Sequence, residues 1–289
     1  MIDNLINIFE MSPRDGLQNE KKFISTADKI KFINKLSSCG FQKIETSSFV
    51  SPKWVPQLSD AADVFKGIKR IKSVKYTALT PNEKGFDNAL VAKVDEVAIF
   101  TAASETFNKK NTNCDISTSL ERFKPIIIKA MKNKIPVRGY ISCVSHCPYE
   151  DYVEPKKVAL IAKKLLEMGC YEVSLGDTTG KGSAYQTYKV IKECLNFTAP
   201  SMLAGHFHDT YLNAIDNIKV CLENGIRTFD ASVGGLGGCP YSPGAEGNVA
   251  TEKVNKLVLS MGYKTNLNNA RIRECSDIAQ KLKKTGIYS

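Results

Sequence analysis

The chain has 289 residues, of which 43% are hydrophobic, and 40 lysines and arginines against 30 acids give it a formal net charge of +10. This length suits one large α/β barrel or two ordinary domains. A basic balance favours polyanionic partners, but the basic residues are spread along the chain without a tail or an aromatic-rich stripe, which argues against a nucleic-acid-binding protein.

Eight short β-type segments follow one another, separated by helix-type sequence. We expect strands over residues 5–12, 41–49, 74–80, 95–104, 136–144, 171–180, 202–210 and 227–235. Amphipathic patterns predict helices over residues 25–40, 119–133, 154–169, 210–225, 248–262 and 268–284. Eight β-then-α units predict one α/β domain over residues 1–289, a (β/α)8 TIM barrel with a C-terminal helical extension. A doubly wound open sheet is the alternative, but no G-x-G-x-x-G or P-loop follows the first strand.

In such a barrel the active site lies at the C-terminal ends of the strands, so the residues at those ends indicate the chemistry. Carboxylates, imidazoles, a thiol and an arginine together are typical of a metal-assisted acid–base site. Such residues follow or end strand one (Arg14, Asp15, Gln18, Glu20), strand two (Glu45), strand six (Asp177) and strand seven (His206, His208), and lie in the loop after strand eight (Cys239, Asn248, Glu252). Two of them, Gln18 and Asn248, carry amide side chains.

Two of the three histidines, His206 and His208, lie one residue apart in the seventh strand. Residues two apart in a strand point to the same face, so both imidazoles can bind one cation, whereas Asp209 points to the other face. A hydrogen-bonded pair of core histidines is the alternative. We favour a metal site because Asp15 can join from strand one. A mixed nitrogen and oxygen site suits Mg²⁺ or Mn²⁺, and Zn²⁺ is the alternative ion.

The acidic and basic residues around this pair have two interpretations each. Arg14 is either one half of a weak surface ion pair with Asp15 or a fixed cation that stabilises an enolate or carboxylate. Glu45 and Asp177 either face the substrate or orient Arg14 or a ligand histidine.

A glycine-rich segment, residues 232–252, follows the eighth strand and holds six glycines and two prolines around Cys239. It contains no lysine or arginine, which argues against a phosphate-binding loop. We expect a mobile lid whose thiol serves as a general acid or base. Asn248 is either the N-cap of the next helix or an oxygen ligand to the metal.

The nine cysteines are irregularly spaced without a C-x-x-C pair, which favours reduced thiols. The first residues resemble neither a secretory signal nor a transit peptide, and no apolar run is long enough to span a bilayer. We therefore expect a cytoplasmic protein without a membrane or nucleic-acid partner.

Six segments together resemble the hydroxymethylglutaryl-CoA lyases, over about residues 11–262. They read SPRDGLQNE, ETSSFVSPKWVPQLSDA, RGYISC, GCYEVSLGDTTG, HFHDTY and GGLGGCPYSPGAEGNVATE. The H-x-H and R-D-G patterns belong to the wider group of TIM-barrel metal-dependent aldol and Claisen enzymes. The cysteine loop and RDGLQNE are typical of the lyase branch.

The resemblance implies a divalent-metal-dependent retro-Claisen cleavage of 3-hydroxy-3-methylglutaryl-CoA to acetyl-CoA and acetoacetate. It implies metal ligation by Asp15, His206, His208 and Asn248, enolate stabilisation by Arg14, and proton transfer by Cys239. It further implies acidic groups near the substrate (Glu45, Asp177), a supporting carboxylate (Glu252) and a homodimer. We also expect Gln18 and Lys21 to contact the substrate. Lys21 is either part of a basic rim for the phosphates of CoA or a solvated surface lysine.

The alternative function is a Claisen-type synthase of the same fold, which condenses acetyl-CoA with a 2-oxo acid. Such synthases usually carry an extra C-terminal region, whereas this chain ends soon after the barrel. The general base, the acyl preference and the choice between leucine breakdown and ketone-body formation stay open.

Overall fold

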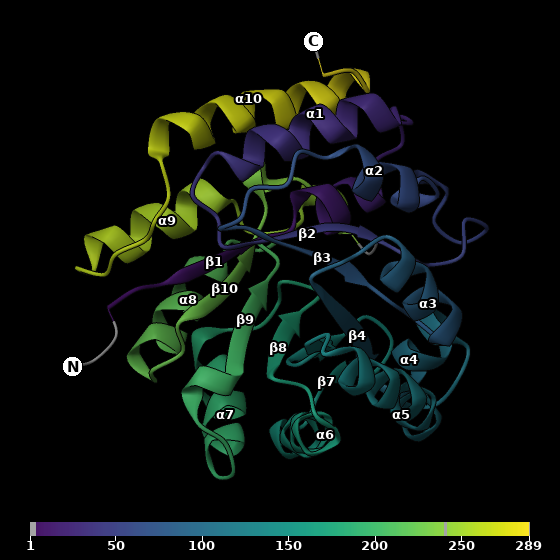
Figure 1. Cartoon of the computed structure of the whole chain (residues 1–289). Coiled ribbons are helices and arrows are strands. Elements are labelled where there is room, and N and C mark those ends of the chain that lie inside the picture. Colours follow the sequence, from purple (N-terminus) through teal and green to yellow (C-terminus); the bar gives the residue numbers. More distant parts are fainter. Residues whose placement is uncertain (1–3, 240–241, 289) are drawn as a thin grey trace.

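The expected barrel is present in the computed structural model, which describes residues 4–239 and 242–288 and, for residues 239 and 242–246, the backbone alone. Eight parallel strands close in the order β1-β10-β9-β8-β5-β4-β3-β2 (Figure 1). They are β1 (Asn7–Glu10), β2 (Lys43–Ser48), β3 (Lys75–Leu79), β4 (Glu96–Ala102), β5 (Val137–Ser142), β8 (Glu172–Asp177), β9 (Leu203–Phe207) and β10 (Thr228–Ala231). The predicted fold class is confirmed, and each strand lies within its expected segment.

The helices surround the barrel and pack apolar faces against the strands (Figure 1). The six expected helices correspond to α1 (Thr26–Ser37), α5 (Ile116–Asn133), α6 (Pro155–Met168), α8 (Ala214–Glu223), α9 (Thr251–Ser260) and α10 (Asn269–Thr285). Four more, α2 (Ala61–Gly67), α3 (Glu83–Val91), α4 (Glu105–Thr112) and α7 (Ala184–Leu195), complete the outer layer. Local capping sets several starts: Ser183 and Gln186, for example, form a reciprocal capping box at α7.

The C-terminal extension is α10, which lies against α1 (Figure 1). The amide of Asn268, the N-cap of α10, donates to the carbonyl of Cys39 at 2.8 Å, just past α1. The far end of α10 reaches the barrel mouth, where Gln280 Nε2 donates to the Gly234 carbonyl at 2.7 Å. The extension therefore closes the first and last units of the barrel on each other.

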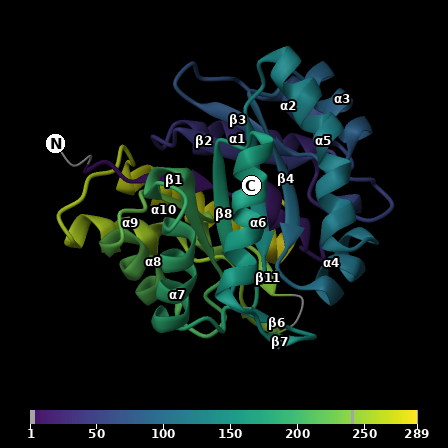
Figure 2. The ribbon, with the colours of Figure 1, turned by 90° about the horizontal axis from the view of Figure 1, so that it is seen from below.

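Two short hairpins lie outside the barrel, toward the lower edge of the view in Figure 2. One pairs β6 (His146–Cys147) with β7 (Asp151–Tyr152), and the other pairs β11 (Gly238–Cys239) with β12 (Ser242–Glu246). The hairpins were not predicted, because strands this short leave no alternating pattern in the sequence. They follow β5 and β10, so both extend from the C-terminal ends of barrel strands.

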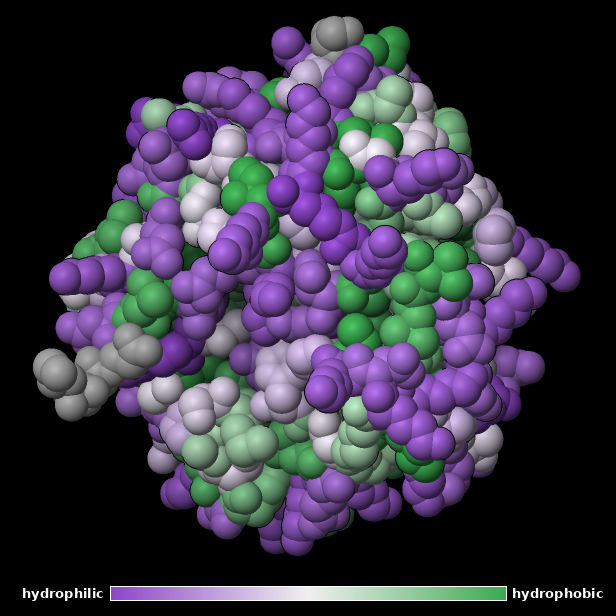
Figure 3. All heavy atoms as spheres, in the orientation of Figure 1, coloured by the Kyte–Doolittle hydropathy of each residue, from purple (hydrophilic) through white to green (hydrophobic). Residues whose placement is uncertain are grey.

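The face of the molecule drawn in Figure 3 carries mostly hydrophilic side chains with small apolar areas between them. Among the described helices, none is both long and apolar enough to cross a membrane.

Candidate active site

One histidine pair and one aspartate meet at the C-terminal mouth of the barrel. Asp15 lies in the π-helical turn η1 (Ser12–Gly16) that follows β1, His206 lies in β9, and His208 follows that strand. Each offers one ligand atom, and these three atoms lie within 4.8 Å of one another. Phe207 between the histidines is buried in the outer apolar core, as the period of two predicts.

Asp209 lies outside this cluster. Its carboxylate pairs with Lys253 Nζ at 2.8 Å, in α9. The prediction from strand parity that Asp209 faces away from both histidines agrees with this placement.

His206 is oriented by Asp230, a buried residue of β10. The Nδ1 atom of His206 lies 3.2 Å from Asp230 Oδ2, and its Nε2 atom lies 3.8 Å from Asp15 Oδ2. Burial lowers the pKa of His206, but the hydrogen bond and charge of Asp230, with the charge of Asp15, outweigh it and raise the pKa. A ring held by a carboxylate through one nitrogen presents the other nitrogen to the mouth of the barrel, as metal-binding histidines do.

His208 presents an unused ring nitrogen. Its Nδ1 atom is buried and has no hydrogen-bond partner among the described residues. Burial, then the neighbouring His206, lowers the pKa of His208 to about 4. The ring is therefore neutral near pH 7, the form that can donate a lone pair to a cation.

Asn248 joins the cluster from the far end of the glycine-rich segment. Its Nδ2 atom donates to Asp15 Oδ2 at 2.7 Å and to the Leu236 carbonyl at 3.3 Å. Its buried Oδ1 atom has no hydrogen-bond partner within the part of the chain that the structure describes. Helix α9 begins only at Thr251, with Ala250 as its N-cap, so the interpretation of Asn248 as an N-cap is wrong.

Backbone bonds fix Asn248 to two barrel strands. The amide of Val249 donates to the Phe207 carbonyl at 3.0 Å, and the amide of Ser232 donates to the Val249 carbonyl at 3.0 Å. Because β9 and β10 are neighbours in the barrel, this end of the glycine-rich segment is held as firmly as the strands themselves.

Arg14 is buried, which excludes the interpretation as half of a surface ion pair. Its Nε atom donates to Glu45 Oε2 and its Nη1 atom to Asp15 Oδ1. Burial alone would raise the pKa of Asp15, but the charge of Arg14, then of the histidines, holds it well below its usual range. Arg14 is thus a fixed cation beside the carboxylate of the cluster.

Glu45 lies behind Arg14, fully buried in β2. Besides Arg14, it accepts a hydrogen bond from the Tyr140 hydroxyl at 3.0 Å, and burial raises its pKa. Of the two interpretations, the contacts are those of a residue that orients Arg14.

Asp177 points away from the cluster. Its Oδ1 atom accepts from Ser145 Oγ at 2.6 Å and its Oδ2 atom from the Gly182 amide at 2.9 Å. Ser174 and Gly176 line the pocket at the mouth. Because successive side chains in a strand point to opposite sides, Asp177 of β8 points away from this pocket.

The pocket at the mouth has a volume of about 320 Å³ and opens over the cluster. Gln18 lines it, and so does the backbone of Gly238. Lys21 is exposed and does not line it. Arg14, Asp15, Tyr140, His206 and His208 contribute the polar walls.

Two further predicted positions, Glu20 and Glu252, are not among the residues that line the pocket. Both carboxylate oxygens of Glu252 accept from the Gly234 amide, at 3.1 and 3.2 Å, so Glu252 anchors the start of the glycine-rich segment. Glu20 is half-buried, and burial raises its pKa. The side chain of Cys239 lies outside the described residues.

Sequence reasoning missed two buried acids that support the site. Asp230 orients His206 as described above. Glu10, at the end of β1, accepts through Oε1 from the amides of Ser12 (2.9 Å) and Val233 (3.0 Å) and through Oε2 from Thr251 Oγ1 (2.8 Å). An acid inside an otherwise apolar strand was the signal available in the sequence for both residues.

Comparison with known proteins identifies a family with the same fold. The family model described as HMGL-like matches residues 5–279. A Pseudomonas aeruginosa protein named 3-hydroxy-3-isohexenylglutaryl-CoA/hydroxy-methylglutaryl-CoA lyase is 52% identical over 91% of this chain and 88% of its own length. The crystal structure of the HMG-CoA lyase from Brucella melitensis is 50% identical, with a TM-score of 0.96 over 96% of this chain and 99% of its own.

A more distant structure carries ligands. It is an HMG-CoA lyase from Acinetobacter baumannii in complex with coenzyme A and 3-methylmalate, and it is 35% identical. Its TM-score is 0.92, over 99% of this chain and 93% of its own.

Proposed function

The chain belongs to the HMGL-like family, and on that premise we propose that it is a carbon–carbon lyase that cleaves 3-hydroxy-3-methylglutaryl-CoA to acetyl-CoA and acetoacetate. The observation that carries the proposal is the cluster of Asp15, His206 and His208 beside the buried cation of Arg14. The names of relatives that cover most of this chain support the same reaction.

A divalent cation fits the donor atoms of the cluster. One carboxylate, two imidazoles and the amide oxygen of Asn248 form a mixed set that suits Mg²⁺ or Mn²⁺. Two buried ligand atoms, His208 Nδ1 and Asn248 Oδ1, have no partner among the described residues. When bound, the cation would polarise the oxygens of the substrate and lower the pKa of its C3 hydroxyl.

The residues around the cluster supply the other roles that the reaction needs. Removal of the C3 hydroxyl proton lets the C2–C3 bond break, so that C3 becomes the ketone of acetoacetate and the electron pair passes to C2 of the acetyl-CoA enolate. Asp15 and Asp177 are the two carboxylates that we consider as the base for this proton, and of these Asp15 lines the pocket and Asp177 does not. Arg14, fixed by Glu45, neutralises the negative charge of the enolate.

The enolate needs a proton at C2 before acetyl-CoA leaves. We assign this proton to the thiol of Cys239, because the backbone of Gly238, the preceding residue, lines the pocket. Glu252 supports this assignment by anchoring the segment at Gly234.

The CoA part of the substrate would extend out of the mouth. Gln18 lines the pocket and is assigned to the acyl end. Lys21 is exposed nearby in the chain and is assigned to the phosphates. We also keep the expected homodimer as part of the proposal, which light scattering of the purified protein tests.

The deciding experiment measures acetoacetate formed from 3-hydroxy-3-methylglutaryl-CoA with Mg²⁺ or Mn²⁺, with a metal-chelated sample as the control. We expect acetoacetate only with the metal. Release of free thiol from acetyl-CoA plus a 2-oxo acid, without acetoacetate from the lyase substrate, would replace the proposal with the synthase alternative. The same assay with a C3-isohexenyl substrate ranks the acyl groups.

A further inference from the structure

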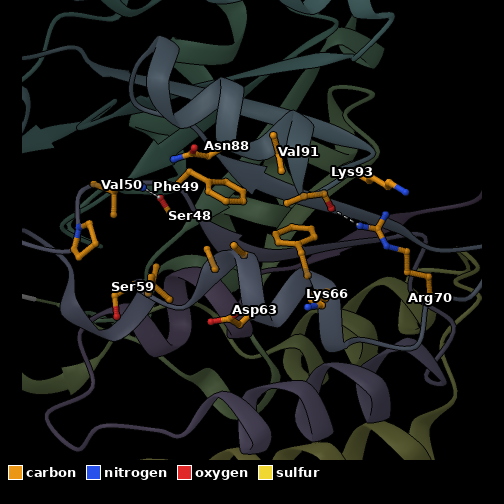
Figure 4. A pocket seen from close by; sticks show the side chains of 16 residues that line it. Ser48, Phe49, Val50, Ser59, Asp63, Lys66, Arg70, Asn88, Val91 and Lys93 are labelled. Atoms are coloured by element: carbon orange, nitrogen blue, oxygen red, sulfur yellow. Dashed lines mark hydrogen bonds between the residues drawn. The ribbon is translucent and has the colours of Figure 1, made fainter.

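A groove of about 670 Å³ lies outside the barrel, between α2 and α3 (Figure 4). This volume is in the range of small-molecule sites, which is about 300–1,000 Å³. Among the described lining residues, only Ser48 and Val50 also line the pocket at the mouth. The groove is therefore a separate hollow that shares one wall with the candidate active site.

The floor of the groove is apolar. The rings of Phe49 and Phe65 stack with their centroids 5.9 Å apart and their planes inclined by 24°. Leu58 continues the floor, and Val91 at the end of α3 is 84% exposed above it. An exposed aliphatic side chain beside two stacked rings forms an apolar surface that can bind the apolar part of a ligand.

One end of the groove is basic. Figure 4 places Lys66, Arg70 and Lys93 at the same end, from α2, the segment after α2 and the turn after α3. Arg70 is held by the Ala92 carbonyl, which accepts from its Nη2 atom at 3.0 Å, and it also lies 3.6 Å from Asp95. Within the described part of the chain, neither Lys66 nor Lys93 has an acidic partner.

A single acid, Asp63, lines the groove against these three cations. In Figure 4 its carboxylate points away from Arg70 and Lys93. The basic end therefore keeps a net positive charge next to an apolar floor.

We propose that this groove is a second ligand site, which binds an amphiphilic anion. Its apolar chain lies on Phe49, Phe65 and Val91, and its carboxylate is bound by Lys66, Arg70 and Lys93. The charge of the head and the length of the chain both contribute to affinity, because the groove has one basic end and one continuous apolar floor. The site does not depend on the lyase reaction, so either proposal can fail without the other.

A second copy of this chain is a poorer occupant. A two-fold symmetric contact with its axis at the basic end would bring Lys66, Arg70 and Lys93 close to their own copies, because residues at the axis of such a contact meet themselves. Like charges placed opposite each other oppose association.

The test is a titration with decanoate, followed by the fluorescence of Trp54. This is the single tryptophan of the chain, it is 77% exposed, and it lies in the loop between the groove residues Pro52 and Leu58. We expect a saturable change. Octanoate should bind about tenfold more weakly, because two methylene groups fewer are buried. Decanol, which lacks the charge, should also bind more weakly.

Matched variants locate the site. Lys66→Glu and Lys93→Gly should each weaken decanoate binding about two- to fivefold, as expected for exposed ion pairs. Lys93 has a φ of 56°, so glycine removes the cation without backbone strain. Lys164→Glu, an exposed lysine on α6, is the matched control and should bind as the parent does.

A second matched pair tests the floor: Val91→Asp should abolish saturation, whereas Leu160→Asp, on exposed Leu160 of α6, should not. An equal loss in the α6 variants, or no saturation in the parent, overturns the proposal. The proposal is also overturned if Arg14→Gln abolishes decanoate binding while Lys66→Glu leaves it intact, because decanoate then occupies the pocket at the mouth of the barrel. If light scattering shows a dimer in the parent that Val91→Asp disrupts, the groove is occupied by a second copy of the chain instead.

Discussion

The two ends of the barrel interior both bury charged side chains, but they use them differently. At the N-terminal end, Arg138 of β5 donates to Glu172 at 2.7 Å and pairs with Asp230 at 2.8 Å. Lys43 of β2 pairs with Glu96 of β4 at 2.9 Å. At the C-terminal end, the buried atoms His208 Nδ1 and Asn248 Oδ1 are left without hydrogen-bond partners among the described residues.

The two ends differ in the pairing of their charges, although Arg138 Nη2 at the N-terminal end also has no hydrogen-bond partner among the described residues. Buried ion pairs within the chain stabilise the closed barrel. Removing one partner leaves the other charge buried and unpaired, which lowers the free energy of unfolding strongly. Ligand atoms that the chain leaves unpaired cost stability and persist where something else binds them. The comparison predicts that variants at the N-terminal end change stability, while variants at the C-terminal end change turnover or metal binding.

The largest expected effect on stability is that of Arg138→Met. It leaves Glu172 and Asp230 buried without their cation, which should lower the free energy of unfolding by about 3–5 kcal/mol. Denaturant unfolding measures this loss, with Arg122→Met, at an exposed arginine of α5, as the control. An unfolding free energy equal to that of the parent would remove the distinction between the two ends.

Arg14→Gln should reduce kcat by about 10²–10³, the usual loss when one donor to a developing oxyanion is removed. Glutamine keeps an amide donor for Glu45, so the loss of stability should be smaller than in Arg138→Met, and Mn²⁺ binding should stay near the parent value. Steady-state kinetics and thermal melting together check this. Turnover close to that of the parent would discard the role of Arg14 at the enolate.

Cys239→Ala should slow turnover about 10²-fold, which is typical of losing a positioned proton donor. It should also abolish inactivation by thiol reagents, while the eight other cysteines stay in place as an internal control. If the alanine variant turns over as fast as the parent, the thiol has no part in proton transfer.

Asp230→Asn tests the residue that joins the two ends, because Asp230 contacts His206 above and Arg138 below. Loss of the carboxylate that orients a ligand histidine should weaken Mn²⁺ binding about 10- to 100-fold. Titration of Mn²⁺ by electron paramagnetic resonance measures it without any turnover. Unchanged affinity would mean that His206 needs no orienting partner.

The smallest expected effect concerns Glu10, whose pKa burial raises to about 7. Its unfolded form loses the proton at lower pH than the folded form does, so folding becomes less favourable as pH rises toward 7. Glu10→Gln mimics the protonated acid. Relative to this variant, the parent should lose on the order of 1–2 kcal/mol of stability between pH 5 and pH 8.

Unfolding curves at both pH values measure the Glu10 effect. Parallel pH dependence in the parent and in Glu10→Gln would show that Glu10 is ionised in the folded protein throughout this range.

The sequence predicted the barrel and the histidine cluster because both depend on short-range periodicity. A period of two places His206 and His208 on one face, and β–α alternation fixes which strand ends meet. It could not say that Asp177 points away, because the exact end of β8 decides that. Nor could it show that Arg138, Glu172 and Asp230 form one buried network, since their pairing depends on strands distant in sequence.

The fixed end of the glycine-rich segment bears on how its thiol acts. Gly238 pairs with Glu246 in the β11–β12 hairpin, and Asn248 is bonded through its neighbours to β9 and β10. Cys239 therefore belongs to a short tether with both ends attached at the barrel mouth. If Cys239 has the proposed role, a tether of this kind would keep a high effective concentration of its thiol near the enolate, as a free thiol in solution would not. Lengthening the hairpin would dilute the thiol without altering its chemistry.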